Sequence, residues 1–435
     1  MTTIDPDQAL TPIEALRATG YTEEGIAKAL GWKDKGALRV DLMARHIAQT
    51  VPVATSPDGR LWVHVDGVWR ADNSDVGRVV SRALGDGTRV AHVREVEAYL
   101  GMMPEALPVL EPLPTPAFVN MLNGLLRWDV GLLTDHDPRA GSTVQIPVWW
   151  DPEAKCPDFE TFLAEVLPAD LVEPTDDSPG WIWEVLGYCL YSGNPFHKAL
   201  LLHGAGRNGK GTLLRVITAM LGRNNVSSVP LHELSTNRFR AATLYGKIAN
   251  IAGDLEGSYL ESTGLFKNIT GGDSIQGEHK YGAVFDFTPY ALPIYSTNSV
   301  FSTPDNSEGY ISRWLVIPFP HSFIGREDAT LGERLEAEVP GVTVKAVEGL
   351  QALMRRGRFA KTASTDAAAE EFARASDPIR RSPRSGWRSW RARPSGPRCS
   401  TWSTSRGATT TASSPRALGD SMREWPRHSQ GQTSA

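Results

Sequence analysis

The sequence predicts an α/β fold, with a parallel sheet in the second half of the chain and a mainly helical N-terminal domain before it. Three observations predict this fold. Four short apolar runs, each next to a polar turn, lie between residues 199 and 319, which is typical of buried parallel strands. A glycine-rich loop follows the first run and leads into a helical pattern. Apolar residues at helical spacing recur between 22 and 47 and between 74 and 101.

Length and composition exclude several classes of protein. The chain has 435 residues, enough for two to four domains at roughly 100–200 residues each. Hydrophobic residues make up 41% and charged residues 22%, and the net charge is −5. These values indicate a soluble protein rather than a basic one that coats nucleic acid. No apolar run reaches the roughly 18 residues of a membrane span, and the acidic N-terminus lacks the apolar core of a secretion signal. The three cysteines form no CxxC pair, so we expect a cytoplasmic protein without zinc or disulfides.

The charge is distributed unevenly. Residues 380–435 contain eleven Arg, four Trp, one Asp, one Glu and no Lys, which gives this tail +9 and leaves −14 for residues 1–379. Arginine and tryptophan suit a nucleic-acid-binding arm, but the lack of any apolar period favours a disordered tail. The composition is also typical of a GC-rich gene read in a shifted frame from near Arg380, which sequencing the gene would test. We place no catalytic role in the tail.

We divide the chain into five segments. They are a helical N-terminal segment (1–50), a mixed, largely helical domain (51–192), an α/β core (193–360), a helical continuation (361–379) and the tail (380–435). In the first segment, helical patterns at 22–30 and about 35–47 suit a DNA-reading helix-turn-helix or, as we favour, an ordinary helical hairpin.

The second segment mixes strand and helix signals. Residues 60–70 alternate in period two around Asp66-Gly67, which predicts a β-hairpin. Further along we expect a proline-rich linker (104–116), short strands (117–150) and helices (158–167 and 180–192).

The clearest chemical pattern is a strand, a glycine loop and a helix at residues 199–221. In such a loop, glycines let backbone N–H groups turn toward a phosphate, and the helix N-terminus adds positive potential. Lys210 stands where an ammonium group reaches the β- and γ-phosphates of a nucleoside triphosphate. Because strand and helix flank the loop correctly, a chance glycine turn is the weaker interpretation. We predict that ATP is bound by Gly204, Gly206, Asn208, Gly209, Lys210, Gly211 and Thr212.

The magnesium ligands are less clear. The hydroxyl that ligates Mg²⁺ normally follows the lysine directly, but Gly211 stands there and Thr212 comes next. Either Thr212 supplies the hydroxyl ligand, or a water molecule takes its place. Asp254 and Glu256 follow the second strand (246–253), on the sheet edge that carries the glycine loop. We assign Asp254 to the metal and Glu256 to the attacking water, although alone the pair would indicate an acidic surface turn.

Two further polar residues lie beside apolar strands. Asn298 ends the strand at 290–298, where an amide can bind both the γ-phosphate and the attacking water. A turn-forming Asn is the alternative. Arg313 precedes the strand at 314–319 and can project to the nucleotide of a neighbouring subunit as an arginine finger.

These motifs together resemble those of superfamily 3 helicases, and within them the phage and plasmid primase–helicases of the poxvirus type. The resemblance rests on five stretches in order: Gly204–Thr212, Gly253–Glu256, Lys267–Asp273, Thr297-Asn298 and Ser312-Arg313. It implies an AAA+-like P-loop ATPase core, a homo-hexameric ring, and ATP- and Mg²⁺-driven 3′ to 5′ translocation on single-stranded DNA. It also implies a phage or mobile-element replication protein in the cytoplasm of a bacterial host. The segment from about Leu61 to Leu190 is similar to the domain that precedes the ATPase in those proteins.

The resemblance also suggests DNA-binding residues. In the family, the region at 274–287 forms a hairpin in the ring channel, and His279 and Lys280 match its basic positions. Lys267 lies on a helix that we predict at 259–269, near the nucleotide or the channel. The 200 residues before the loop show no primase module, so we expect a separate primase or other replication proteins as partners.

Three functions remain open at this point. The first is a replicative DNA helicase. The second is an initiator or loader that uses ATP for assembly with little unwinding. The third is a non-functional prophage fragment, which the anomalous tail favours. The basic hairpin favours the helicase, because a loader need not translocate.

Overall fold

The computed structural model describes residues 18, 20, 32–33, 37–56, 59–71, 73–84, 89–103, 107–111, 114–253, 255, 260, 262–278, 284–300, 303, 305, 307–326 and 328–376. All of them belong to the first of two units, residues 1–383. The helix that we predict at 22–30 and the basic tail lie outside the described residues.

In its described part, the N-terminal region combines three helices with a small antiparallel sheet. The helices are α3 (Val40–Thr50), α4 (Asn73–Leu84) and α5 (Val90–Gly101), and the strands are β3 (Val53–Thr55), β4 (Leu61–Val65) and β5 (Val68–Arg70). The predicted hairpin is confirmed, because β4 pairs with β5 across Asp66 (φ 50°) and Gly67 (φ 81°). Two successive left-handed residues are what a two-residue hairpin turn of type I′ requires.

One predicted helix boundary is wrong in this region. We expected the second helix to begin near Lys35. Instead, β1 (Trp32–Lys33) pairs antiparallel with β2 (Ala37–Leu38), and α3 begins at Val40. The backbone groups of residues 37–38 bond across to β1, so they are not available to a helix.

The segment before the core follows the predicted order of short strands and then helices. The strands β6 (Val119–Met121), β7 (Gly124–Arg127) and β8 (Leu132–Thr134) form an antiparallel meander. A short 3₁₀ turn, η1 (Pro138–Ala140), follows, and then the helices α6 (Pro157–Val166), α7 (Ala169–Val172) and α8 (Trp181–Leu190).

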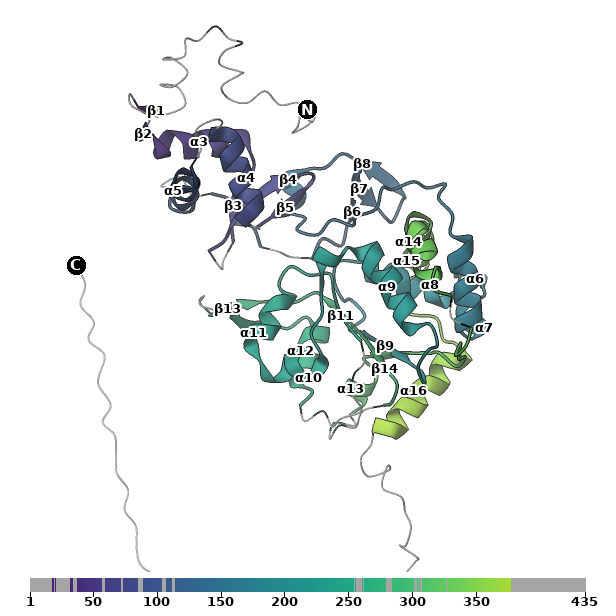
Figure 1. Cartoon of the computed structure of the whole chain (residues 1–435). Helices are drawn as coiled ribbons and strands as arrows, with labels where there is room; N and C mark the ends of the chain where they lie inside the picture. The colour runs from purple at the N-terminus through teal and green to yellow at the C-terminus, as the bar shows by residue number, and fades with distance from the viewer. Residues whose placement is uncertain are drawn as a thin grey trace, which may run out of the picture. The chain divides into compact units, whose positions relative to one another are not determined.

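A five-stranded sheet forms the centre of the core (Figure 1). Its strands are β9 (Ala199–His203), β10 (Val226–Ser227), β11 (Ala249–Ala252), β14 (Leu292–Thr297) and β15 (Trp314–Pro318). All neighbours are parallel, in the order β10-β11-β14-β9-β15. The predicted parallel sheet and its four main strands are therefore confirmed, whereas the two-residue β10 was not predicted.

Helices and one β-hairpin complete the core. The helical elements are α9 (Lys210–Leu221), η2 (Arg223–Asn225), α10 (Leu231–Thr236), α11 (Arg238–Ala241), η3 (Ala242–Leu244), α12 (Gly264–Gly271), α13 (Glu308–Ile311), α14 (Leu331–Ala337), α15 (Val339–Arg356) and α16 (Ala363–Ser376). The strands β12 (Ile275–Glu278) and β13 (Val284–Phe287) pair antiparallel, which confirms the predicted hairpin. The start predicted for the helix at 259–269 is wrong, because Thr263 is not helical and its hydroxyl donates to Asp305. Among the described helices, none has the length and apolar character needed to cross a bilayer.

Both faces of the sheet are covered by helices. Alternate residues of β9 belong to two separate apolar clusters: Leu200 and Leu202 to one, Ala199 and Leu201 to the other. The first cluster includes residues of α8, α9 and α15, and the second includes residues of α12, α13 and α16. A parallel sheet buried on both sides explains why its strands are continuous apolar runs.

Helices α8 and α15 touch backbone to backbone at two glycines. A Cβ atom added to Gly187 would lie 2.2 Å from the carbonyl oxygen of Ala346, and one added to Gly349 would lie 2.2 Å from that of Trp183. We expect Gly187→Ala to lower the free energy of unfolding by about 3 kcal/mol, because the helices must move apart. Urea denaturation measures this. Gly264→Ala is the control, since its Cβ would have no neighbour nearer than 3.8 Å; equal midpoints for the two variants would contradict the prediction.

Candidate functional site

The loop between β9 and α9 has the backbone conformation of an anion-binding turn. Gly206 (φ 103°), Arg207 (φ 45°) and Gly209 (φ 92°) all have positive φ. Successive N–H groups in such alternating conformations point into one concavity, which attracts anions. Helix α9 begins at Lys210, with Gly209 as its N-cap, so the free N–H groups of its first turn face the same loop. The loop therefore offers several backbone donors to one ligand.

Two glycines are required because other elements pass close to the loop. A Cβ atom on Gly204 would lie 2.5 Å from the carbonyl oxygen of Phe319, and one on Gly209 would lie 2.8 Å from Cγ1 of Val166. The Asn208 amide donates to that Phe319 carbonyl at 3.1 Å, and the Phe323 N–H donates to the Arg207 carbonyl at 2.8 Å. The end of β15 and the helix α6 thus fix the shape of the loop.

The ammonium group of Lys210 is the centre of the site. Its Nζ donates to the carbonyl oxygen of Gly204 at 2.6 Å, to Oδ1 of Asn208 at 3.0 Å and to Oδ1 of Asn298 at 3.0 Å. The side chain is only 5% exposed. Asn298 follows β14, which neighbours β9 in the sheet, so two motifs 88 residues apart meet at one nitrogen atom. A phosphate oxygen entering the loop would replace these neutral acceptors with a charged one.

His203 closes β9 beside this lysine. Burial lowers the pKa of His203; Glu371 on α16 opposes that shift, and the charge of Lys210 adds to it. The imidazole is therefore biased toward its neutral form. The positive charge of the site comes from Lys210 rather than from His203.

The two candidate acids, Asp254 and Glu256, lie outside the described residues, but Leu255 between them is described. Its N–H donates to the carbonyl oxygen of Ser296 at 2.8 Å, and its own carbonyl accepts from the hydroxyl of Thr297 at 3.0 Å. Ser296 and Thr297 are the last residues of β14. The segment after β11 is therefore attached to the strand end that carries Asn298.

The candidate magnesium ligand Thr212 lies in the first turn of α9, and its side chain is partly buried. A hydroxyl oxygen in the first turn of a helix has the hard-donor chemistry that Mg²⁺ prefers. Gly211 before it has no atom within 4 Å of an added Cβ, so this side of the loop is open. Within the described residues there is no group of three or more metal-binding side chains.

Arg313 lies at the N-terminal end of the parallel strands, whereas Lys210 lies at their C-terminal end. Its carbonyl oxygen accepts from the N–H of Ala199, the first residue of β9, whereas Lys210 follows the last one. Five residues of β9 span about 16 Å. The Arg313 side chain donates through Nε to Oγ1 of Thr270 at 2.9 Å and through Nη1 to the Gly309 carbonyl. It therefore faces away from the glycine loop of its own chain.

Lys198 was missed by the sequence reasoning. Its Nζ donates to the carbonyl oxygen of Ser312 at 2.5 Å. Burial lowers its pKa, and the nearby charge of Arg313 lowers it further. Two cations thus lie side by side at this edge because β15 pairs with β9. The only sequence signal would have been a lysine directly before the first strand. A role for that lysine cannot be inferred until the pairing of β15 with β9 is known.

The candidate DNA-binding residues have different surroundings. Lys267 on α12 forms an ion pair with Asp305 at 2.5 Å. Burial raises the pKa of Asp305, but hydrogen bonds from Lys267, Ser307 and Thr263 outweigh it and hold that pKa well below its usual range. The charge of Lys267 is therefore compensated within the chain. His279 and Lys280 lie outside the described residues, between the paired strands β12 and β13.

Comparison with known proteins matches two parts of the chain to family models. Residues 40–168 match the family described as "D5 N terminal like". Residues 202–313, which run from β9 to Arg313, match a "Family of unknown function (DUF5906)". A curated relative, "Putative helicase L207/L206" of Acanthamoeba polyphaga mimivirus, is 26% identical over 166 residues. That match covers 37% of this chain and 17% of the relative, so it spans a small part of the longer protein.

Solved structures that resemble the chain include "The A form apo structure of NrS-1 C terminal region-CTR", with 12% identity, 75% of this chain and 73% of that one covered, and a TM-score of 0.49. "The apo structure of NrS-1 C terminal region (305-718)" has 12% identity, the same shares covered and a TM-score of 0.47. The match to "D5 N terminal like" and the similarity to the viral putative helicase each cover less than half of the chain.

Proposed function

We propose that this chain is an ATP-dependent DNA helicase for the replication of a phage or mobile element. It belongs, on this proposal, to superfamily 3, acts as a homo-hexameric ring in the cytoplasm of a bacterial host, and moves along single-stranded DNA. The observation that carries the proposal is the meeting of Lys210 and Asn298 at 3.0 Å, at the mouth of a glycine loop on a parallel sheet. The match to "D5 N terminal like" and the similarity to a putative helicase support it.

Each residue at this edge of the sheet has a role in hydrolysis under the proposal. The loop N–H groups and Lys210 bind the β- and γ-phosphates and neutralise charge that develops in the transition state. Thr212 and Asp254 hold Mg²⁺, which would supply further charge neutralisation at the phosphate oxygens. Glu256 orients the attacking water, and Asn298 binds the water and the γ-phosphate.

The opposite edge serves the neighbouring subunit. Arg313 and Lys198 lie about one strand length from Lys210 of their own chain. In a ring, this edge of one subunit faces the nucleotide of the next. Arg313 then acts as the arginine finger, and Lys198 adds a second positive charge.

DNA binding in the channel is assigned to the tip of the β12–β13 hairpin. One His279 and one Lys280 per subunit give a ring of basic groups, so an acidic chain needs only its channel to be basic. Lys267 has a weaker claim, since Asp305 compensates its charge.

Lys280→Ala tests the helicase proposal. We expect the variant to keep the ATPase rate without DNA, but to lose stimulation by single-stranded DNA and unwinding of a forked duplex. The reason is that a lost phosphate contact uncouples DNA from the ATP site. Phosphate release with and without an oligonucleotide, together with a strand-separation assay, measures both effects on the full chain. Lys155→Ala, which removes an exposed lysine from the segment before the core, is the control.

The outcomes also separate the alternatives. Unaltered unwinding by Lys280→Ala would show that the hairpin is not the DNA contact. Hydrolysis by the unaltered chain without any DNA stimulation would favour an initiator or loader. Absence of hydrolysis in every state would favour the non-functional fragment.

A further inference from the structure

The C-terminal end of α15 carries positive charge that the proposed ATP and channel sites do not use. Residues 354–361 read Met-Arg-Arg-Gly-Arg-Phe-Ala-Lys. The helix ends at Arg356, and Gly357, with φ 71°, turns the chain out of it. Arg355, Arg358 and Lys361 are exposed. Within the part of the chain that the structure describes, these three side chains make no hydrogen bond or ion pair.

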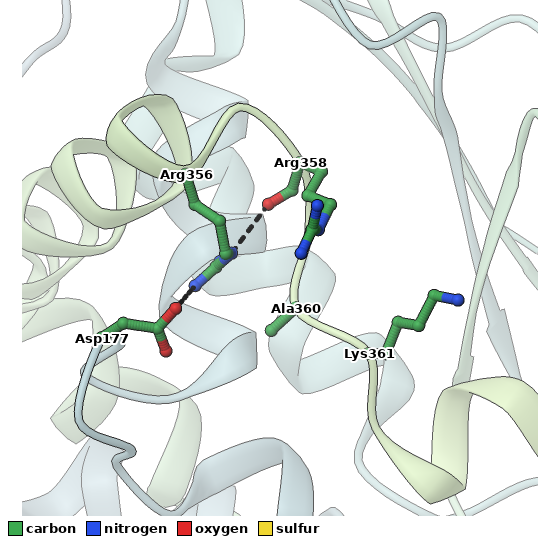
Figure 2. Close-up of a pocket in the computed structure, with 5 residues that line it drawn as sticks. All are labelled: Asp177, Arg356, Arg358, Ala360 and Lys361. Atoms are coloured by element: carbon green, nitrogen blue, oxygen red, sulfur yellow. Dashed lines mark hydrogen bonds and ion pairs between the residues drawn. The ribbon is translucent and has the colours of Figure 1, made fainter.

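A cavity of about 640 Å³ lies at this segment, lined by Asp177, Arg356, Arg358, Ala360 and Lys361. Figure 2 shows Arg356 turned toward Asp177, while Arg358 and Lys361 extend from the connection that follows α15. Arg355, the neighbouring residue, lines a second cavity of about 390 Å³ together with Trp128, Asp129, Gln351 and Met354. The same helix end thus contributes cations to two cavities.

The frame of the first cavity is fixed by a buried carboxylate. Glu184 on α8 is fully buried and forms an ion pair with Arg356. It also accepts from the hydroxyl of Ser178 at 2.5 Å and from the N–H of Ala360 at 3.3 Å. Nη1 of Arg356 pairs in addition with Asp177 at 3.1 Å. The charge of Arg356 is therefore used internally, and the backbone between Arg358 and Lys361 is held in place.

The two remaining cations suit a chain of phosphates. Their Cα atoms are three residues apart and at most about 11 Å from each other, so both side chains can reach one short stretch of a phosphate backbone. Guanidinium binds phosphate in a bidentate manner, and ammonium binds it as a point charge. Trp128 adds an aromatic wall to the second cavity, and nucleic-acid bases stack on tryptophan.

We propose that Arg355, Arg358 and Lys361 form a second nucleic-acid contact, which binds the sugar–phosphate backbone of a single strand outside the ring channel. It rests on the proposed function in one respect, namely that the ligand is the DNA on which the protein acts. Arg356 is not part of the contact, because its guanidinium group is already paired with Glu184 and Asp177.

The test is the double variant Arg358→Gln/Lys361→Gln in the full chain. A labelled 20-nucleotide oligo-dT is titrated at several salt concentrations, and its fluorescence anisotropy gives the Kd. We expect the Kd to rise roughly tenfold, because two charged contacts are lost. The slope of log K against log salt should fall in magnitude by about 1.4, since each phosphate contact to a single strand contributes about 0.7. The rate of ATP hydrolysis without DNA should be unchanged.

The control is Lys155→Gln/Arg223→Gln, which removes the same charge from exposed positions away from both cavities. A Kd and a salt slope equal to those of this control would overturn the proposal. The proposal would also be overturned if millimolar ATP displaced the oligonucleotide from the unaltered chain but not from the double variant. The two cations would then bind free nucleotide instead of a strand. If the unaltered chain hydrolyses ATP but the double variant behaves as the control, only this contact is wrong. If the unaltered chain neither hydrolyses ATP nor binds the oligonucleotide, the proposed function fails as well.

Discussion

Replacement of Lys210 by alanine is expected to reduce ATP hydrolysis by at least about a hundredfold, the usual cost of losing a charge-stabilising donor in a buried site. The ammonium group lies between the Gly204 carbonyl, Asn208 and Asn298. His203 at the end of β9 is biased toward its neutral form, so it does not replace that charge. Phosphate release under saturating ATP measures the effect.

Lys247→Ala is the matched control for this variant. Lys247 is partly buried, and its Nζ also donates to a backbone carbonyl, that of Asn224 at 2.5 Å, but it precedes β11, at the N-terminal end of the strands. It should keep the hydrolysis rate. Wild-type hydrolysis by Lys210→Ala would remove the basis for the ATP site. A thermal melt of both variants checks that the acceptors left without a donor have not unfolded the core.

Replacement of Arg313 by alanine is expected to lower kcat about a thousandfold or more, the known range for loss of an arginine finger. Arg313 and Lys210 lie at opposite ends of the parallel strands. The lost activity should therefore be restored by a second subunit that keeps its arginine. Neither Arg313→Ala nor Asp254→Ala should hydrolyse ATP alone. A mixture of the two should recover activity, since some interfaces then combine an intact arginine with an intact acid.

A purely structural role for Arg313 makes a different prediction. Its Nε bonds to the hydroxyl of Thr270, which is fully buried. Thr270→Val removes this bond and keeps the arginine. If Thr270→Val loses as much activity as Arg313→Ala, or if no mixing ratio restores activity, Arg313 supports its own chain instead of acting on the neighbour.

Much of the fold could be predicted because its signals are local. An apolar run, a glycine loop and a helical pattern identify β9, the loop and α9 without knowledge of any other segment. The signal for the β4–β5 turn is equally local, since the Asp-Gly pair is by itself enough to permit two left-handed residues. Asn298 could be proposed because it ends a strand, and parallel strands end at one edge.

The remaining features depend on pairings between distant segments. The two residues of β10 form a strand only because β11 lies beside them. Lys198 gains a partner only because β15 pairs with β9. The start of α12 is set by Asp305, 42 residues from Thr263. The charged end of α15 has no apolar period or motif. Which of its cations are left for a ligand depends on Glu184, which pairs with Arg356.

The hydroxyl of Thr297 has a consequence for the order of steps in the nucleotide cycle. One oxygen atom bonds both the Leu255 carbonyl and the Ser299 backbone, and so connects the acidic segment to the residues on either side of Asn298. Under the proposed function, a shift of this strand end during the nucleotide cycle would therefore be transmitted to Leu255, which lies between the two acids proposed for the metal and the water. Detection of product and resetting of the site would then be one mechanical event instead of two successive ones.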